Sequence, residues 1–187
     1  ANFLDDHSYF RAAKELLKQD DVQGADALFR KSLEINPKNV ASRLQLATDL
    51  MSQGQTTEAS YHFRKIIELE PGHMGAHFCL AEILYDEQEL SEAMLHYRQA
   101  LRANPNLHEA HLKLGLIFLV TDKLEAAAES FVEAARLEPR SAMGHYYCGI
   151  TFHRLGKPEE AVSYYERSVQ CNPELLPALL GLASIHI

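Results

Sequence analysis

Small and apolar residues return along the chain at the spacing of one helix face. Leu46, Ala47 and Leu50 form one such stripe, because residues three and four apart lie on the same side of a helix. The stripe recurs every 34 residues, as Ala12, Ala13 and Leu16; Leu80, Ala81 and Leu84; Leu114, Gly115 and Phe118; and Cys148, Gly149 and Phe152. We therefore expect one helix in each interval, with this stripe buried.

Three further columns of residues keep the same interval. Prolines stand at Pro37, Pro71, Pro105, Pro139 and Pro173. Alanines stand at Ala25, Ala59, Ala93, Ala127 and Ala161, and aromatic residues follow them at Phe29, Phe63, Tyr97, Phe131 and Tyr165. Proline disfavours helix in the residue before it and donates no backbone hydrogen bond. Each interval is thus expected to hold a second helix, which contains the alanine and the aromatic residue and ends at the proline.

Turn and cap residues separate the two helices of an interval. Turn chemistry is expected from Gly54, Asp122 and Gly156. The second helix is expected to start near Thr57 or Ser91, which are good N-cap residues, or after Pro158, which suits a first helical turn.

Counted from Asp6, each 34-residue unit has a small residue at position 8, alanine at 20, Phe or Tyr at 24 and proline at 32. This helix-turn-helix unit resembles the tetratricopeptide repeat, and the resemblance covers residues 6–187. It implies an all-α fold, a right-handed α-solenoid of about five and a half repeats whose first helices line a concave groove. The expected boundaries are an N-terminal extension at 1–5, repeats at 6–39, 40–73, 74–107, 108–141 and 142–175, and a partial sixth repeat at 176–187 with a first helix only.

The sequence departs from the family at position 4, where Trp is frequent. The residues there are Tyr9, Arg43, His77, His111 and His145. This loosens the consensus packing without threatening the fold. We expect a histidine at this position to be a packing residue with a polar tip; a stack of histidines whose charge changes near neutral pH is the alternative.

Positions 2, 5, 9 and 12 form a second face on each first helix, which the resemblance points into the groove. From this face and the adjoining Tyr147, we expect a partner-binding surface at Phe10, Met51, Phe78, Tyr85, Leu112, Leu116, Met143, Tyr146, Tyr147 and Ile150. A contiguous exposed apolar surface usually marks a binding site, here for an amphipathic helix or extended peptide. The alternative is packing between adjacent first helices, with Leu17, Leu44, Leu112 and Leu119 as its best candidates.

Charged residues flank this surface. They are Arg11, Lys14, Lys18, Glu82, Asp86 and Lys113. A bound peptide could then place an acidic end near the first repeat and a basic residue near the third. Ordinary solvated surface charge is the alternative, since such charges contribute little to binding or stability.

Two known uses of the fold do not fit this sequence. The carboxylate clamp of tetratricopeptide co-chaperones needs Lys, Asn and Arg where the first reading frame has Phe10, Lys14, Gln45, Gly75 and Cys79, and the two later frames fail as well. The asparagine ladder of glycosyltransferase-linked repeats is also missing, because position 6 reads Arg11, Gln45, Cys79, Lys113 and Tyr147.

The partial sixth repeat carries the apolar stripe again, at Leu179, Leu182 and Ala183. No second helix follows in the sequence to cover it, and solenoids normally end in a polar capping helix. We expect either that the chain is a piece of a longer protein or that this helix mediates self-association.

Composition narrows the classes of partner. With 187 residues, 47% hydrophobic and 24% charged, the chain has ample apolar material to fold. The net charge of −8 argues against nucleic acid, and the longest apolar run, 114–120, is too short to insert into a membrane. Three cysteines without a CxxC pair, and no basic-then-apolar leader, favour a reducing compartment and a cytoplasmic location.

No motif for catalysis, a cofactor or a metal is recognisable. Phosphate loops, GxGxxG, HExxH and nucleophile elbows are absent from the sequence. His108 and His111 have a chelating spacing, but Glu109 is expected on a different face. Cys148 is expected to be buried and inert, and no base accompanies Cys79.

The sequence thus predicts a non-catalytic adaptor or assembly scaffold that binds a partner protein in an apolar groove. Two alternatives stay open. One is the substrate-recruiting arm of a larger enzyme, such as a glycosyltransferase-like protein; the other is a self-assembling scaffold.

Overall fold

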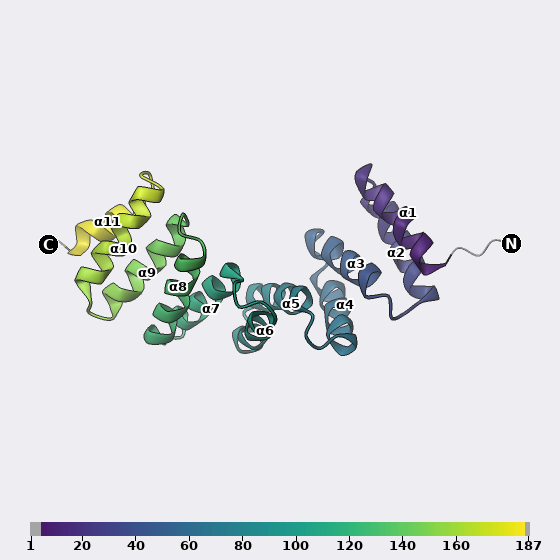
Figure 1. Cartoon of the computed structure of the whole chain (residues 1–187), viewed down its shortest axis with the longest axis horizontal. Coiled ribbons are helices and arrows are strands. Elements are labelled where there is room, and N and C mark those ends of the chain that lie inside the picture. Colours follow the sequence, from purple (N-terminus) through teal and green to yellow (C-terminus); the bar gives the residue numbers. More distant parts are fainter. Residues whose placement is uncertain (1–4, 186–187) are drawn as a thin grey trace. The chain divides into compact units, whose positions relative to one another are not determined.

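The computed structural model describes residues 5–185 of the chain, and within them it forms eleven α-helices and no strand (Figure 1). The chain divides into two compact units, with the boundary after Gln99. Residues 1–4 of the expected N-terminal extension and residues 186–187 of the expected sixth repeat lie outside the described residues.

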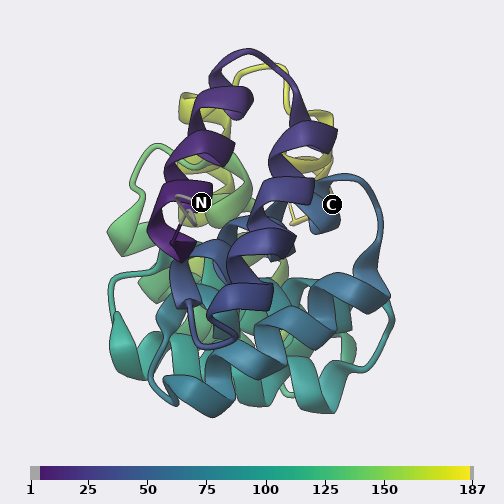
Figure 2. The same ribbon diagram turned by 90° about the vertical axis from the view of Figure 1, so that its right-hand side faces the viewer.

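The first unit consists of paired antiparallel helices. They are α1 (Asp6–Lys18), α2 (Val22–Ile35), α3 (Val40–Ser52), α4 (Thr56–Leu69), α5 (Met74–Asp86) and most of α6 (Leu90–Ala103). Each of α1 to α4 packs on the helix that follows it. Figure 2 shows the α1–α2 hairpin at the front, with the connecting loop at the top.

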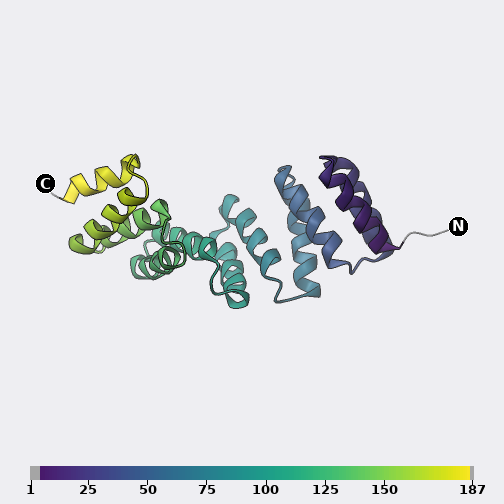
Figure 3. The same cartoon turned by 45° about the horizontal axis from the view of Figure 1, so that its top comes forward.

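The second unit continues the same plan. Its helices are α7 (His108–Val120), α8 (Leu124–Leu137), α9 (Ala142–Arg154), α10 (Pro158–Cys171) and α11 (Leu176–Ile185). Each of α7 to α10 packs on the helix that follows it, and α11 also contacts α9. Figure 3 shows α11 in yellow beside α10.

The fold is therefore an all-α solenoid built from helix-turn-helix units, as the sequence predicts. The odd-numbered helices begin at Asp6, Val40, Met74, His108, Ala142 and Leu176. The assignment of repeat boundaries to these residues stays a prediction. None of the helices in the described part of the chain has the length and apolar character that crossing a bilayer requires.

The residue at position 15 of each 34-residue repeat makes the turn between the two helices of that repeat. Its residue is left-handed each time, with φ of 62° at Asp20, 75° at Gly54, 65° at Gln88, 57° at Asp122 and 70° at Gly156. The next backbone N–H then returns to the first helix, as in the 2.9 Å bond from Gln55 to the Leu50 carbonyl. This geometry caps a helix C-terminus. The turn predictions are confirmed, and Asp20 and Gln88 join them.

The predicted N-caps of the second helices are wrong. Helix α4 begins at Thr56 and α6 at Leu90, so Thr57 and Ser91 lie inside the first turn. The reason is the left-handed turn, which redirects the chain into the second helix a residue or two earlier. Gln55 is the actual N-cap of α4, and its side chain makes no capping hydrogen bond, whereas Pro158 does begin α10 as predicted.

The second helices end where the proline column predicts. Helix α2 stops at Ile35, and the cap residue Asn36 adopts an extended conformation with φ −131° and ψ 90° before Pro37. Helices α4, α8 and α10 stop in the same register before their prolines. Proline thus acts here by excluding helix from the residue that precedes it.

The core consists of the predicted stripe and the aromatic column. Phe29, Phe63, Tyr97 and Phe131 have no accessible surface, and Tyr165 is 3% exposed. The stripe is buried in α3, α5 and α7. The prediction that the whole stripe is buried is wrong for three residues of α1 and α9: Ala12 is exposed, and Leu16 and Phe152 are half-buried. The Phe152 ring stacks instead on Tyr164, with ring centroids 5.3 Å apart.

Two glycines allow the last aromatic ring to lie between helices. A Cβ on Gly149 would stand 2.5 Å from the Tyr165 ring, and one on Gly181 would stand 2.6 Å from the same ring. The Tyr165 side chain is therefore held between α9 and α11 with no room to shift.

Candidate functional site

Each first helix has two apolar faces that differ in burial. The stripe that faces the second helices is closed to solvent, as Leu46, Leu80 and Cys148 illustrate at 0% exposure. None of the ten predicted partner-binding side chains is buried in this way: nine are half-buried, and Met143 is 39% exposed. The sequence thus separates a core face from a face that keeps contact with solvent.

In the first unit, two aromatic residues of the predicted surface rest on core aromatics. The ring centroids of Phe10 and Phe29 are 5.8 Å apart, and those of Phe78 and Tyr97 are 5.9 Å apart. Met51 and Tyr85 are half-buried on α3 and α5. Core contacts therefore fix the orientation of the two phenylalanine rings, which keep part of their surface accessible.

In the second unit, α9 carries the densest part of the predicted surface. Tyr147 stacks on Phe131 with centroids 5.3 Å apart and planes at 16°, and Tyr146 lies 5.5 Å from Tyr147. Tyr146 and Ile150 also pack against the buried cluster that contains Tyr165. The structure thus brings together three predicted residues of α9 on a rigid aromatic base.

The remaining predicted apolar residues of the second unit lie on α7 and at the start of α9. Leu112 and Leu116 are half-buried and Met143 is exposed. The four leucines favoured for core packing, Leu17, Leu44, Leu112 and Leu119, are also half-buried. Burial therefore does not distinguish them from the other residues of this face.

The predicted flanking cations on α1 are Arg11, Lys14 and Lys18, and two of them have partners. The Lys18 ammonium lies 2.6 Å from a Glu15 carboxylate oxygen, and the Lys14 ammonium donates to the side-chain oxygen of Gln45 at 3.3 Å. Arg11 is exposed. The sequence did not indicate these two partners, because both contacts depend on side-chain rotamers rather than on spacing.

The acidic side of the predicted surface is tied to the core. Glu82 accepts a hydrogen bond from the buried Tyr97 hydroxyl, and burial together with this carboxylate raises the pKa of Tyr97 above its usual range. Asp86 is exposed and Lys113 is half-buried. Glu82 therefore acts in part as the partner of a core phenol.

From the second repeat to the fifth, the side chain at position 4 contacts the backbone carbonyl of the preceding proline. The side chains donate to the proline carbonyl six residues earlier: Arg43 to Pro37 at 2.5 Å, His77 to Pro71 at 3.0 Å, His111 to Pro105 at 2.9 Å and His145 to Pro139 at 2.9 Å. His77 and His145 are buried, which confirms for these two the expectation of a packing residue with a polar tip, whereas His111 is half-buried. The constant spacing from the proline was the signal for this contact that our sequence reasoning missed.

Position 23 supplies a second contact to this side chain in the first unit. Arg43 donates from Nη1 to Nδ1 of His62 at 3.1 Å, and Nδ1 of His77 lies 2.9 Å from Nδ1 of His96. Burial, followed by the charge of Arg43, lowers the pKa of His62. Burial, followed by His77, likewise lowers the pKa of His96.

The cysteines in the first helices are not activated thiols. Burial raises the pKa of the Cys148 thiol to about 12, and burial with the nearby Glu82 raises the pKa of Cys79. The thiolate is the nucleophilic form of cysteine. Cys148 is buried, as predicted, and Cys79 is half-buried.

The histidines of α7 do not belong to a metal cluster. Among residues 5–185, no three His, Cys, Asp or Glu side chains gather closely enough to hold a metal ion. The Glu109 carboxylate nevertheless reaches Nδ1 of the adjacent His108 at 3.2 Å. Adjacent side chains on a helix can meet in this way when the carboxylate turns back along the surface.

Three family models match parts of the protein. One described as TPR repeat matches residues 81–120, and one described as tetratricopeptide repeat matches residues 112–175. The model of subunit 3 of the anaphase-promoting complex, or cyclosome, matches residues 18–100. A search of the curated proteins finds no significant match.

Solved structures share the fold at low identity. MamA from Desulfovibrio magneticus RS-1 is 18% identical, covers 94% of this chain and 99% of its own, and has a TM-score of 0.80. YrrB, described as a TPR protein with an unusual peptide-binding site, is 20% identical over 94% of this chain and 91% of its own, with a TM-score of 0.82. PilF of Pseudomonas aeruginosa is 20% identical over 97% and 84%, with a TM-score of 0.78.

The matched segments extend from residue 18 to residue 175 and contain the proline, alanine and aromatic columns, and the helix pairs have the arrangement of the solved tetratricopeptide structures. The chain belongs to the tetratricopeptide repeat family.

Proposed function

We propose that the protein is a non-catalytic adaptor or scaffold that binds a segment of a partner protein on the half-exposed apolar face of its first helices. The tetratricopeptide fold supports a role as a protein–protein interaction module, and proteins of this type are generally not catalysts. The ligand of this proposal is an amphipathic helix or an extended peptide.

The observation that carries the proposal is the packing and partial exposure of two apolar side chains on α9. Tyr146 and Ile150 lie one helical turn apart, rest on a buried cluster and keep accessible surface. Rigid aromatic side chains of this kind often dominate binding energy, because they bury a large area and lose little conformational entropy. Each such anchor can contribute about 2 kcal/mol to binding when it is enclosed by a partner.

The apolar character of the face favours a peptide with apolar anchors. A partner helix with apolar residues at positions i, i+3 and i+4 could place them between Tyr146, Leu116 and Met143. Methionine and tyrosine suit such a surface since they adapt to the shape of a ligand. The likeness to YrrB, a protein with a peptide-binding site, agrees with this choice.

Affinity capture with matched baits tests the proposal. The groove variant carries Tyr85→Lys, Leu116→Glu and Tyr146→Lys. The control variant carries Tyr61→Lys and Leu95→Glu, which change exposed residues of the second helices α4 and α6. Both baits are checked for native helicity by circular dichroism.

We expect a directly binding partner to be held by the native bait and the control variant and lost by the groove variant. Direct binding is then measured with purified partner, where the groove variant should weaken the affinity at least about 100-fold. The proposal is wrong if the groove variant binds as tightly as the native protein.

A second candidate function is self-association through α11. Leu176 is 61% exposed, Leu180 is 59% exposed and Leu179 is 40% exposed, so one helix presents an apolar face to solvent. Light scattering over a concentration series should show a growing mass for the native protein and a constant monomer for a Leu176→Ser, Leu180→Ser variant. A native protein that stays monomeric at the highest concentration contradicts this candidate.

A further inference from the structure

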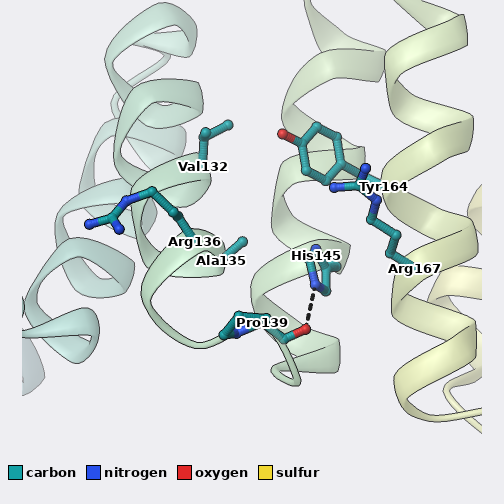
Figure 4. Close-up of a pocket in the computed structure, with 7 residues that line it drawn as sticks. All are labelled: Val132, Ala135, Arg136, Pro139, His145, Tyr164 and Arg167. Carbon is teal, nitrogen blue, oxygen red and sulfur yellow. Dashed lines mark hydrogen bonds between the residues drawn. The ribbon is translucent and has the colours of Figure 1, made fainter.

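A pocket of about 390 Å³ lies on the second unit between α8, α9 and α10 (Figure 4). Its lining residues are Val132, Ala135, Arg136, Pro139, His145, Tyr164 and Arg167. None of these belongs to the predicted partner-binding surface, and all except His145 lie on the second helices or the loop after α8. The pocket is therefore a separate feature of the molecule.

One buried imidazole lines this pocket with half of its hydrogen-bonding capacity unused. His145 is 6% exposed, and its Nε2 lies 2.9 Å from the Pro139 carbonyl oxygen. Because a carbonyl oxygen only accepts, Nε2 must carry the hydrogen. Nδ1 of the same ring is buried and has no hydrogen-bond partner among the described residues. Figure 4 shows the ring between Pro139 below and the space bounded by Val132 and Tyr164 above.

The equivalent positions of the first unit show what normally fills this role. In the second repeat Arg43 donates to Nδ1 of His62, and in the third repeat the Nδ1 atoms of His77 and His96 meet. In the fifth repeat position 23 is Tyr164, whose ring stacks on His145 with centroids 6.2 Å apart. A stacked ring offers no donor or acceptor to Nδ1, so the polar contact made elsewhere is missing here.

The pocket also presents a cation. The Arg167 guanidinium lies 5.6 Å from the Tyr164 ring centroid and, among the described residues, forms no ion pair. Arg136 differs, because Glu133 holds it through two bonds of 2.9 and 2.6 Å and Figure 4 shows its guanidinium pointing away from His145. No carboxylate belongs to the lining, so the electrostatic field in the pocket favours an anion.

The geometry points to a binding site for a carboxylate group of a partner protein, either an Asp or Glu side chain or the free C-terminus. The planar guanidinium of Arg167 matches the two oxygens of a carboxylate. Nδ1 of His145 takes up a proton from solvent when the anion binds and donates it as a hydrogen bond, while Nε2–H stays on Pro139. The apolar walls formed by Val132, Ala135 and Pro139 accommodate the methylene groups or the backbone that carry the carboxylate.

A phosphate monoester fits this pocket less well. It carries nearly two negative charges and three strongly accepting oxygens, and it needs several cationic or N–H donors. Only Arg167 and a protonated His145 offer such donors while Glu133 holds Arg136. The site goes beyond the proposed function, since it uses different side chains from those of the apolar face.

Proton uptake gives the site a measurable signature. The titratable and charged groups around His145 are Arg136 and Glu133 of α8, and Tyr164, Arg167 and Cys171 of α10, whose thiol also reaches the Pro139 carbonyl at 3.7 Å. Because the proposed binding step adds one proton to Nδ1 of His145, carboxylate binding should tighten as the pH falls.

Nuclear magnetic resonance titration of the full, isotope-labelled protein tests the inference. The probes are N-acetylglycine, which has an α-carboxylate, N-acetylglutamic acid α-amide, which keeps only its γ-carboxylate, the neutral N-acetylglycinamide, and inorganic phosphate. We expect saturable shifts at the His145 imidazole and at the Tyr164 and Arg167 amides with at least one carboxylate probe, stronger at the lower pH. The neutral amide should give no such shifts.

Matched variants separate the pocket from general effects on folding. Arg167→Gln and His145→Phe should each weaken carboxylate binding about tenfold. His111→Phe removes the equivalent bond to Pro105 and leaves the pocket intact, so it should bind like the native protein. Glu133→Gln releases Arg136 and should tighten binding.

Several results overturn the inference. They are the absence of pocket shifts with both carboxylates, equal binding of the neutral amide, binding of phosphate alone, or an equal loss in His111→Phe and His145→Phe. If the groove variant captures the partner as well as the native bait, the result of these titrations does not change. The two proposals can therefore be contradicted independently.

Discussion

The contact between positions 4 and 23 differs between the two units of the molecule. In the first unit Arg43 and His77 each use both ends of the side chain, one on a proline carbonyl and the other on a histidine ring. In the second unit His145 keeps the proline bond and faces Tyr164, which offers no polar contact. The proline contact thus recurs from the second repeat to the fifth, whereas the second contact varies between repeats.

The residue at position 8, in the buried stripe of each first helix, also differs between the two units. The first unit has Ala13, Ala47 and Ala81 there, and the second has Gly115 and Gly149. The glycines lie against the rings of Phe131 and Tyr165. Where the first unit has an alanine methyl group, the second unit therefore has direct contact between an aromatic ring and the helix backbone.

The largest effect is expected at this close contact. Gly149→Ala should lower the free energy of unfolding by about 2 kcal/mol, because Gly181 on the other side prevents Tyr165 from moving away. Urea unfolding of the native protein and the variant measures the loss. Gly72→Ala, where an added Cβ meets nothing within 4 Å, is the control and should change stability by less than about 0.5 kcal/mol. A neutral result at Gly149 would show that the ring can give way.

Replacement of the position-4 histidines should lower the free energy of unfolding more in the first unit than in the second. His77→Phe removes the partner of the Pro71 carbonyl and of Nδ1 of His96, while Nε2 of His96 keeps Glu92, and should cost about 1.5 kcal/mol. His145→Phe breaks one bond and leaves the Cys171 thiol near Pro139, so about 1 kcal/mol is expected. Urea unfolding compares the two. Equal losses would mean that the His77–His96 contact adds nothing to stability.

Acidification should destabilise the first unit through His62. Burial and Arg43 lower its pKa below the ordinary value of 6.5, so the unfolded state binds the proton more tightly than the folded one. The stabilising contribution is complete above pH 6.5 and is lost as the pH falls toward and through the folded pKa. Hydrogen exchange of α3 and α4 amides should therefore accelerate, after correction for intrinsic rates, between neutral and mildly acidic buffer. His62→Gln should remove this part of the pH dependence, and an unchanged profile in that variant would contradict the assignment.

The smallest effect is expected from the surface ion pairs of the first unit. Arg30 pairs with Glu58 at 2.6 Å and Arg64 with Glu92 at 2.7 Å, but these side chains are between 37% and 47% exposed. A double-mutant cycle on Arg30 and Glu58 should give a coupling of about 0.5 kcal/mol, reduced further by salt. A coupling that salt leaves unchanged would indicate a pair more shielded from solvent than its exposure implies.

Much of the fold follows from local rules that the sequence displays. Proline at position 32 excludes helix from the residue before it, and a glycine such as Gly54 favours a left-handed turn, so the helix ends next to these residues can be located. The N-cap prediction at Thr57 failed because the turn geometry, rather than the capping residue, sets the start of the helix.

The site was predicted less completely, for a physical reason. The apolar face was recognisable from helical spacing, which decides the direction of Tyr146 and Ile150. The pocket at His145 was not, since it depends on which residue of α10 meets the ring and on the pairing of Arg136 with Glu133. Such contacts join residues of different helices, and their rotamers leave no periodic signal in the sequence.

The most direct test of the account is hydrogen exchange of the protein with and without a purified partner identified by capture. If the first helices bind the partner, slower exchange should be concentrated in α9 around Tyr146 and Ile150 and in the neighbouring first helix α7, while α8 and α10 change little. Protection confined to α10 or α11, with none in α9, would contradict the central claim that the apolar face of the first helices is the binding surface.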